Sequence, residues 1–326
     1  MNSFALTLAS IVKKSYILFL IIFLATGLRF YKLGQNPPST NWDETAHGYN
    51  AYSILKTQRD EYGSKLPLYF RSFDDYKPPF YTYAVVPSVA LFGLTDFAVR
   101  VPSALFGVLA VLFTYLMVEL LLKNKTIACL ASFFLAISPW HLQVSRVAFE
   151  SACSIFFITF GTWAFFKGIN SQKKQVFWLS ISAASFGINL FVYHSSRIFT
   201  PIFGLVLLLL YRHDLLKDVK KLIFPALIAA IFVIPLVQIS TSISGLMRFR
   251  GTAIFSQPAP KELASKWIQQ DKEQNLEYFG KILHNRRIAY VPQVLSNYLS
   301  HLDPKYLFIT ADQDRHHAPL VGLLYL

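Results

Sequence analysis

The sequence predicts an all-α, polytopic membrane protein with about seven transmembrane helices, and its composition and apolar runs carry that prediction. Hydrophobic residues make up 54% of the 326 residues and charged residues only 15%, whereas a soluble domain carries about 25% charged residues. Apolar runs recur along the chain and are separated by short basic turns. A segment in lipid must satisfy its own backbone hydrogen bonds, so runs of this kind favour helices.

The basic turns predict how these helices are oriented. Lys13 and Lys14 precede the first apolar run, and basic residues beside membrane helices favour the cytoplasmic side. Three later turns are basic in the same way; they contain Lys123 and Lys125, then Lys167, Lys173 and Lys174, and then Arg212, Lys217, Lys220 and Lys221. All of them lie inside if helices span residues 15–30, 99–122, 126–140, 150–166, 176–193, 198–211 and 222–239.

One apolar segment does not fit the spanning pattern. Its continuous run within residues 78–92 has about 13 residues, whereas a span takes about 20. A full crossing would also turn every later basic turn outward. We therefore expect a juxtamembrane or re-entrant helix whose two ends both lie outside.

The predicted organisation has three parts. Residues 1–240 form a transmembrane module, whose first external loop spans 31–98. Residues 241–317 form an external loop with amphipathic helices, and residues 318–326 begin a further membrane helix. Since that last helix is cut short, we expect a C-terminally truncated protein.

Charge and cysteine content exclude other classes. The net charge of +13 comes from residues in the turns, so we predict no nucleic-acid partner. Cys129 and Cys153 lie in apolar segments and are expected to be small buried side chains, with no disulfide framework and no metal site. No cofactor follows from the residues, and a requirement for a divalent cation stays open.

Two short polar motifs lie in the first external loop, and both place charge beside hydrocarbon, which is costly without a function. Asp43 and Glu44 follow the first helix and precede a helical stretch over 49–55. They are the predicted catalytic carboxylates, with Asp43 as a general base. Alternatively, Asp43 caps the helix N-terminus and Glu44 only favours its first turn through the helix dipole.

The second motif is Lys77 followed by Pro78 and Pro79. Two prolines suit the first turn of a helix, so they hold Lys77 at a helix N-terminus, where a cation opposes the helix dipole. A phosphate ligand would explain that placement, since helix N-terminal amides and an ammonium both favour an anion. The alternative is a lysine whose side chain extends to lipid head groups.

Further polar residues are predicted on the same external face. Arg146 is either a second phosphate ligand or the partner of Glu150 in a helical ion pair. Arg197 is a phosphate candidate of similar weight, and His194 is a metal ligand, a proton shuttle or an interfacial residue. Asp75 and Tyr193 complete the predicted substrate-binding residues.

These residues resemble the C-type (GT-C) membrane glycosyltransferases, above all the bacterial relatives of dolichyl-phosphate-mannose protein mannosyltransferases and of the transferase that adds aminoarabinose to lipid A. Single matches are weak, but together they run over nearly the whole chain in family order. The matching segments are Trp42-Asp43-Glu44, Tyr76-Lys77-Pro78-Pro79-Phe80, residues 97–107, Ser138-Pro139 with Ser145-Arg146, and residues 297–308.

The resemblance implies an inverting transferase that moves a sugar from a polyprenyl-phosphate carrier to a lipid, polysaccharide or protein acceptor outside the cytoplasm. It implies Asp43 as the catalytic carboxylate and Lys77 as a ligand of the carrier phosphate. It also implies an integral protein of the cell membrane, in contact with membrane lipid, with further helices beyond this chain. The aminoarabinose-transferring relatives carry an Arg shortly after the Asp-Glu pair and a Glu before the Lys, where this chain has Ala46, His47 and Tyr76.

Two other classes remain as alternatives. A transporter or flippase of lipid-linked sugars would place polar residues near the membrane midplane, whereas the polar clusters here lie at the external ends of helices. A non-catalytic subunit of a glycosyltransferase complex fits a truncated chain. The transferase is the prediction carried forward.

Overall fold

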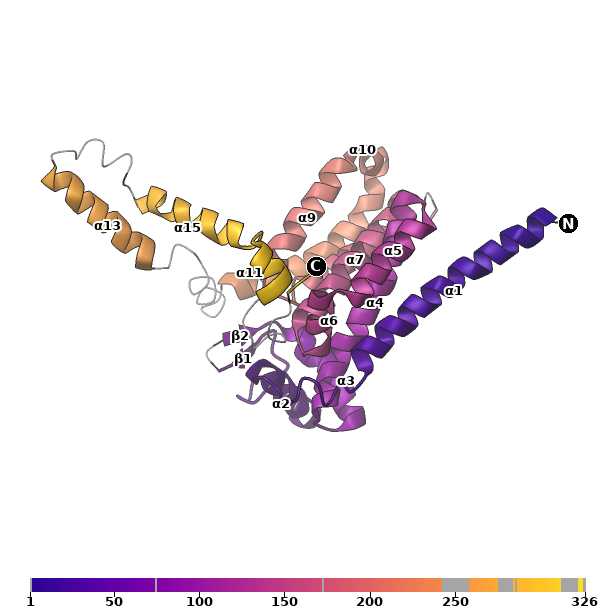
Figure 1. Cartoon of the computed structure of the whole chain (residues 1–326), viewed down its shortest axis with the longest axis horizontal. Coiled ribbons are helices and arrows are strands. Elements are labelled where there is room, and N and C mark those ends of the chain that lie inside the picture. Colours follow the sequence, from indigo (N-terminus) through magenta and orange to yellow (C-terminus); the bar gives the residue numbers. More distant parts are fainter. Residues whose placement is uncertain are drawn as a thin grey trace. The chain divides into compact units, whose positions relative to one another are not determined.

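The computed structural model describes residues 2–73, 75–171, 173–241, 258–274, 284, 286–311 and 322–324. The chain divides into two compact units, Met1–Ile239 and Ser240–Leu326. The described part is predominantly helical, as Figure 1 shows, which confirms the predicted all-α class.

The first unit consists of consecutive helices joined mostly by short turns. They are α1 (Asn2–Phe30), α2 (Trp42–Thr57), α3 (Pro79–Phe92), α4 (Asp96–Leu122), α5 (Lys125–Ile137), α6 (Pro139–Arg146), α7 (Glu150–Ile169), α8 (Gln175–Asn189), α9 (Ser196–Leu210), α10 (Arg212–Leu215), the 3₁₀ helix η1 (Leu216–Leu222) and α11 (Ile223–Thr241). Each predicted apolar segment corresponds to a helix, and α3 is the short helix expected after the two prolines.

Within the described residues, three helical segments are long and apolar enough to cross a membrane: Asp96–Leu122, Glu150–Ile169 and Arg212–Val237. A fourth span results if the bent pair of α5 and α6 is counted as one. Tyr16–Phe30, Pro79–Phe92 and Ser196–Leu210 are apolar but shorter. These findings fit a polytopic membrane protein, and the count of seven spans stays a prediction.

The structure differs from the sequence prediction at the third helix. A single helix was predicted over 126–140, but α5 ends at Ile137 and α6 begins at Pro139, with a 56° bend between them. Pro139 explains the break, because a proline has no N–H to continue the helix and restricts the residue before it.

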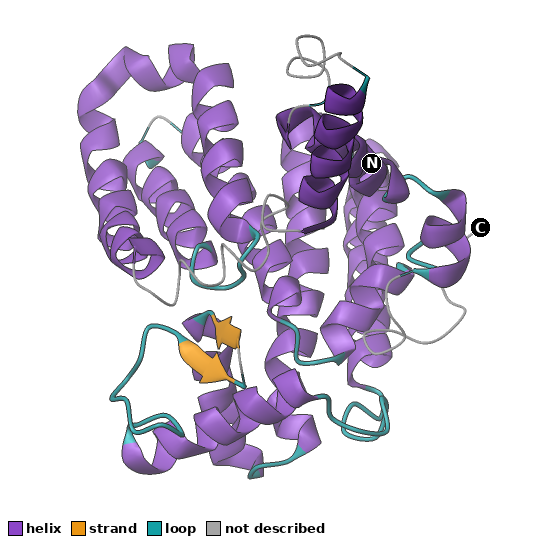
Figure 2. Cartoon of the chain, turned by 90° about the vertical axis from the view of Figure 1, so that its left-hand side faces the viewer, coloured by secondary structure: helices purple, strands orange, loops and turns teal. Residues whose placement is uncertain are grey.

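A short antiparallel hairpin was not predicted. Strand β1 (Phe70–Ser72) pairs with β2 (Asp75–Lys77), and Phe70 lies opposite Lys77. Figure 2 shows the two strands beside the helices at one end of this unit. Three-residue strands are too short for an alternating hydrophobic pattern to be recognised in the sequence.

Helix α4 is the centre of the first unit, since α1, α2, α3, α5, α6 and α7 all pack against it. The core contains Tyr81 and Val85 of α3, Val99 and Ala110 of α4, and Phe157 of α7, each of them buried. Small residues let the helices approach closely. At Gly107 of α4 an added Cβ would lie 2.7 Å from the Ser145 Cβ and 3.0 Å from the Arg29 Nε.

The second unit is described only in part. It contains α13 (Pro258–Glu273), α15 (Arg286–Ser300) and a π-helical turn, η3 (Tyr306–Thr310), and α13 packs against α15. Helix α13 lies within the predicted external helical segment. Most of the predicted final helix at 318–326 falls outside the described residues.

We predict that Gly107→Ala lowers the free energy of unfolding by about 1–3 kcal/mol, because the methyl group overpacks the junction of α1, α4 and α6. Thermal unfolding of the purified protein in detergent measures the effect. Gly204→Ala in α9 is the matched control, since an added Cβ there meets nothing within 4 Å. Equal unfolding temperatures for the two variants would show that the close approach at Gly107 is unimportant.

Candidate active site

Asp43 lies in the first turn of α2, and its neighbour Asn41 caps the helix. The Asn41 side chain accepts a hydrogen bond from the Glu44 N–H at 2.9 Å, and the Glu44 carboxylate accepts one from the Asn41 N–H at 3.0 Å. These two bonds form a capping box. The alternative that Asp43 itself is the cap is therefore wrong.

Asp43 forms an ion pair with Lys77. The Lys77 Nζ lies 3.0 Å from the Asp43 Oδ1, and the two side chains are 13% and 21% exposed, respectively. Lys77 ends β2, directly before the two prolines that begin α3. The structure thus brings together the leading residues of the two motifs, which are 34 positions apart in the printed sequence.

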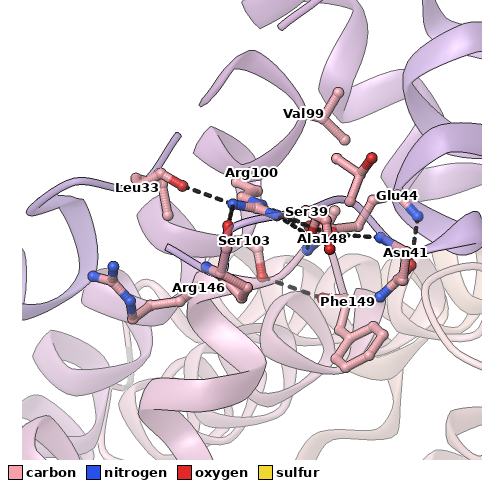
Figure 3. Close-up of polar contacts among 12 residues, drawn as sticks. Leu33, Ser39, Asn41, Glu44, Val99, Arg100, Ser103, Arg146, Ala148 and Phe149 are labelled. Carbon is pink, nitrogen blue, oxygen red and sulfur yellow. Dashed lines mark hydrogen bonds and ion pairs between the residues drawn. The ribbon is translucent and has the colours of Figure 1, made fainter. Parts of the chain in front are cut away.

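Glu44 occupies a different environment, shown in Figure 3. Its side chain is 1% exposed, and the Arg100 Nε lies 2.8 Å from its Oε1. The Arg100 Nη2 donates to Oε2 at 3.2 Å, and the Ala148 N–H donates to Oε1 at 3.1 Å. Both carboxylate oxygens of Glu44 are therefore engaged inside the protein.

Arg100 also holds the loop between α1 and α2. Its Nη1 donates to the carbonyls of Leu33 and Pro37 at 3.0 and 2.9 Å, and its Nη2 donates to the Ser39 carbonyl at 3.1 Å. Sequence reasoning assigned Arg100 no role. An arginine within an apolar helix was the available signal, because such a charge is costly unless it is paired.

Arg146 contacts backbone carbonyls at the end of α1. Its Nη1 donates to Leu28 at 2.6 Å and to Arg29 at 3.3 Å, and its Nη2 donates to Tyr31 and Asn36 at 2.9 and 3.0 Å. A cation suits this position, since the last carbonyls of a helix lack intrahelical partners.

The alternative of a helical Arg146–Glu150 pair is wrong. Helix α6 ends at Arg146 and α7 begins at Glu150, so the two residues do not share a helix. The Glu150 Oε1 lies 3.3 Å from the His47 Nε2 instead.

The turn between α8 and α9 lies close to the Lys77 segment. The His194 Nε2 lies 2.8 Å from the Tyr76 carbonyl, and the Phe80 N–H donates to the Phe191 carbonyl at 3.2 Å. Arg197 donates through Nε to the Leu190 carbonyl at 3.3 Å, and Tyr193 is 37% exposed. The side chain of Asp75 lies outside the described residues.

Among the described residues no group of three or more histidine, cysteine, aspartate or glutamate side chains could hold a metal ion. The candidate site contains the Asp43 carboxylate and the Lys77 ammonium, which contact each other and are both partly exposed. A carboxylate can accept a proton, and an ammonium can bind an anion.

Comparison with known proteins identifies the family. The family model described as dolichyl-phosphate-mannose-protein mannosyltransferase matches residues 76–239, which is half of the chain. The chain belongs to this family. The matched segment includes Lys77 at the end of β2, Arg100 of α4 and Arg146 of α6, whereas Asp43 precedes it.

Two curated relatives match this chain over part of their length. YkcB of Bacillus subtilis (strain 168), named as a candidate mannosyltransferase, is 28% identical over 169 residues, which are 50% of this chain and 22% of YkcB. An uncharacterized protein of Aquifex aeolicus (strain VF5) is 29% identical over 178 residues, or 54% of this chain and 34% of that protein. The chain thus spans about a quarter to a third of these relatives.

A solved structure shows the same fold. The archaeal oligosaccharyltransferase AglB of Archaeoglobus fulgidus, determined with an inhibitory peptide and a dolichol-phosphate, superposes with a TM-score of 0.55 at 15% identity. The likeness covers 89% of this chain and 37% of AglB. The family chain therefore has a GT-C type membrane fold.

We predict that Glu44→Gln lowers the free energy of unfolding by about 3 kcal/mol, because it leaves the buried Arg100 guanidinium without an anionic partner. Thermal unfolding in detergent measures the loss. Glu119→Gln is the control, since the Glu119 side chain is 31% exposed and lies 3.7 Å from Lys125; such pairs contribute little. An unfolding temperature unchanged by Glu44→Gln would refute a structural role for this pair.

Proposed function

We propose that this chain is the membrane module of an inverting glycosyltransferase that takes a sugar from a polyprenyl-phosphate donor. The observation that carries the proposal is the partly exposed pair of Asp43 and Lys77, 3.0 Å apart. Membership of a mannosyltransferase family and a GT-C type fold support it. The acceptor is a lipid, a polysaccharide or a protein hydroxyl on the extracytoplasmic face.

Lys77 binds the donor phosphate in this proposal. The ammonium supplies the charge, because Pro78 and Pro79 have no N–H and the Phe80 N–H already donates to the Phe191 carbonyl. As the bond between the anomeric carbon and the phosphate oxygen breaks, its electron pair stays on that oxygen. The lysine then stabilises the developing negative charge.

Asp43 acts as the general base. The acceptor hydroxyl oxygen attacks the anomeric carbon from the face opposite the phosphate, which inverts its configuration, and Asp43 takes the hydroxyl proton. The Glu44–Arg100 pair fixes the first turn of α2 and thereby positions Asp43. We assign Glu44 this positioning role because both of its oxygens are already engaged.

The ion pair implies competition between Asp43 and the donor. A phosphate that binds Lys77 displaces the Asp43 carboxylate, at least in part, from the ammonium that it contacts. Donor binding thereby releases the Asp43 carboxylate for a hydrogen bond from the acceptor hydroxyl.

The other candidate residues have smaller roles in the proposal. His194 contacts the Tyr76 carbonyl next to Lys77, and Arg197 lies in the first turn of α9 soon after it, so both stay candidates for contacts with the donor. Asp75 and Tyr193 stay candidates on sequence grounds. Arg146 is not given a phosphate contact, because its guanidinium already binds four carbonyls.

We predict opposite effects of two substitutions on donor binding and the same effect on transfer. Asp43→Asn abolishes transfer yet tightens binding of undecaprenyl phosphate about threefold, because it removes the carboxylate that competes for Lys77. Lys77→Met abolishes transfer and weakens binding about tenfold. Purified protein supplies the binding constants, and membranes with a panel of labelled polyprenyl-phosphate sugars supply the transfer rates.

Lys125→Met is the matched control, since Lys125 pairs with Glu119 at the start of α5 and its side chain is 42% exposed. Running the transfer assay with and without EDTA tests the divalent cation. Full transfer by Asp43→Asn would reject the base. Movement of intact donor across vesicles without any sugar transfer would favour the transporter alternative.

The orientation of the site gives a separate prediction. A membrane-impermeant maleimide should label Ser64→Cys in intact cells but Lys217→Cys only after permeabilisation, with Cys129 and Cys153 first replaced by alanine. Ser64 lies in the exposed loop after α2, and the Lys217 side chain is 73% exposed between α10 and α11. The reverse labelling pattern would place the site on the cytoplasmic face.

A further inference from the structure

Two buried polar side chains near the ion pair have no part in the transfer step proposed above. His47 is 1% exposed and Glu150 is 7% exposed, and the His47 Nε2 lies 3.3 Å from the Glu150 Oε1. Burying an imidazole and a carboxylate is costly unless they are paired and hydrogen-bonded. Apolar residues of similar volume at these positions would have given an equally or more stable core. We therefore looked for a functional reason for the pair.

The pair is fixed in its orientation by the elements that carry the site. His47 lies one turn after Asp43 on α2, and its Nδ1 lies 2.9 Å from the Thr82 Oγ1 of α3. The His47 ring also packs 4.9 Å from the Tyr81 ring, centroid to centroid. Both ring nitrogens thus have a neighbour, one on α3 and one on α7.

Glu150 connects this pair to Lys77. It is the first residue of α7, which packs against α3, and Lys77 precedes α3 by two residues. Both groups reach the first turns of α2, because the Lys77 ammonium contacts Asp43 and the Glu150 carboxylate contacts His47, four residues further along the helix. Lys77 thus lies in a cluster with two carboxylates, Asp43 with a 21% exposed side chain and Glu150 with a 9% exposed one.

The two carboxylates are suited to different tasks. A donor phosphate displaces the more exposed Asp43, and the flexible four-carbon side chain of Lys77 then loses its contact with that carboxylate. A buried carboxylate is screened less by solvent and keeps acting on the ammonium. Protein kinases hold a phosphate-binding lysine with a glutamate of a neighbouring helix in a comparable way.

We infer that Glu150, oriented by His47, is a positioning residue that holds the Lys77 ammonium for the phosphate of a lipid-linked donor. The inference rests on the proposed function, because it assumes that Lys77 is a phosphate ligand. It adds a role for a pair that the transfer mechanism does not use.

Removing the charge of Glu150 tests this role, because the two possible roles predict opposite changes in the affinity for a lipid phosphate. If Glu150 only repelled the phosphate, Glu150→Gln would tighten the binding of an anionic lipid. If Glu150 holds Lys77 in place, the same substitution weakens that binding. We expect undecaprenyl phosphate to bind Glu150→Gln about tenfold more weakly than the wild type, and His47→Gln to change binding in the same direction.

A double-mutant cycle separates positioning from general damage to the fold. In a Lys77→Met background, Glu150→Gln should cause no further loss of undecaprenyl phosphate binding, because the group through which it acts is gone. Glu119→Gln is the control for loss of a carboxylate elsewhere on the chain. Thermal unfolding of each purified variant in detergent accompanies the binding measurements.

The outcomes distinguish this inference from the proposed function. Tighter binding by Glu150→Gln, or an equal loss with and without Lys77, would overturn the positioning role while leaving the phosphate site intact. Failure of the wild-type chain to bind undecaprenyl phosphate would overturn the proposed function and this inference with it. Weaker binding that depends on Lys77 supports both.

Discussion

The buried ion pair of Glu44 and Arg100 is the interaction on which the site depends. It joins the first turn of α2 to α4, and α4 is the helix around which the first unit packs. Arg100 also binds three carbonyls of the loop after α1. Because a buried charge without its partner is strongly unfavourable, the loop, the helix start and the central helix are fixed together. Asp43 directly precedes Glu44, so its position is fixed as well.

Arginine and lysine side chains have different roles around the candidate site. Arg100, Arg146 and Arg29 are planar donors directed mainly at carbonyls and at one buried carboxylate, and they fix backbone. Lys77 is a compact charge on a flexible stem with a partly exposed partner. The division follows the chemistry of the two side chains, since a guanidinium makes several directed hydrogen bonds and an ammonium adapts to a ligand.

The sequence predicts the helices well because apolar runs and basic turns act locally, and α3, α4 and α7 begin or end within a few residues of the predicted positions. Pairings across the chain are harder to predict. The contact of Asp43 with Lys77 and the buried pair of Glu44 and Arg100 both depend on how α2, α3 and α4 pack. The predicted phosphate role of Arg146 rested on charge and position alone. Its carbonyl partners lie more than a hundred residues earlier in the chain.

The β1–β2 hairpin limits which insertions and deletions the sequence of this protein can accept. Lys77 ends a strand whose register sets Phe70 opposite it, and side chains alternate between the two faces of a strand. Adding or deleting one residue in the connection from Ser72 to Asp75 would shift that register and turn the lysine to the other face. Relatives that keep this chemistry should therefore tolerate changes of residue type in the connection far better than changes of its length.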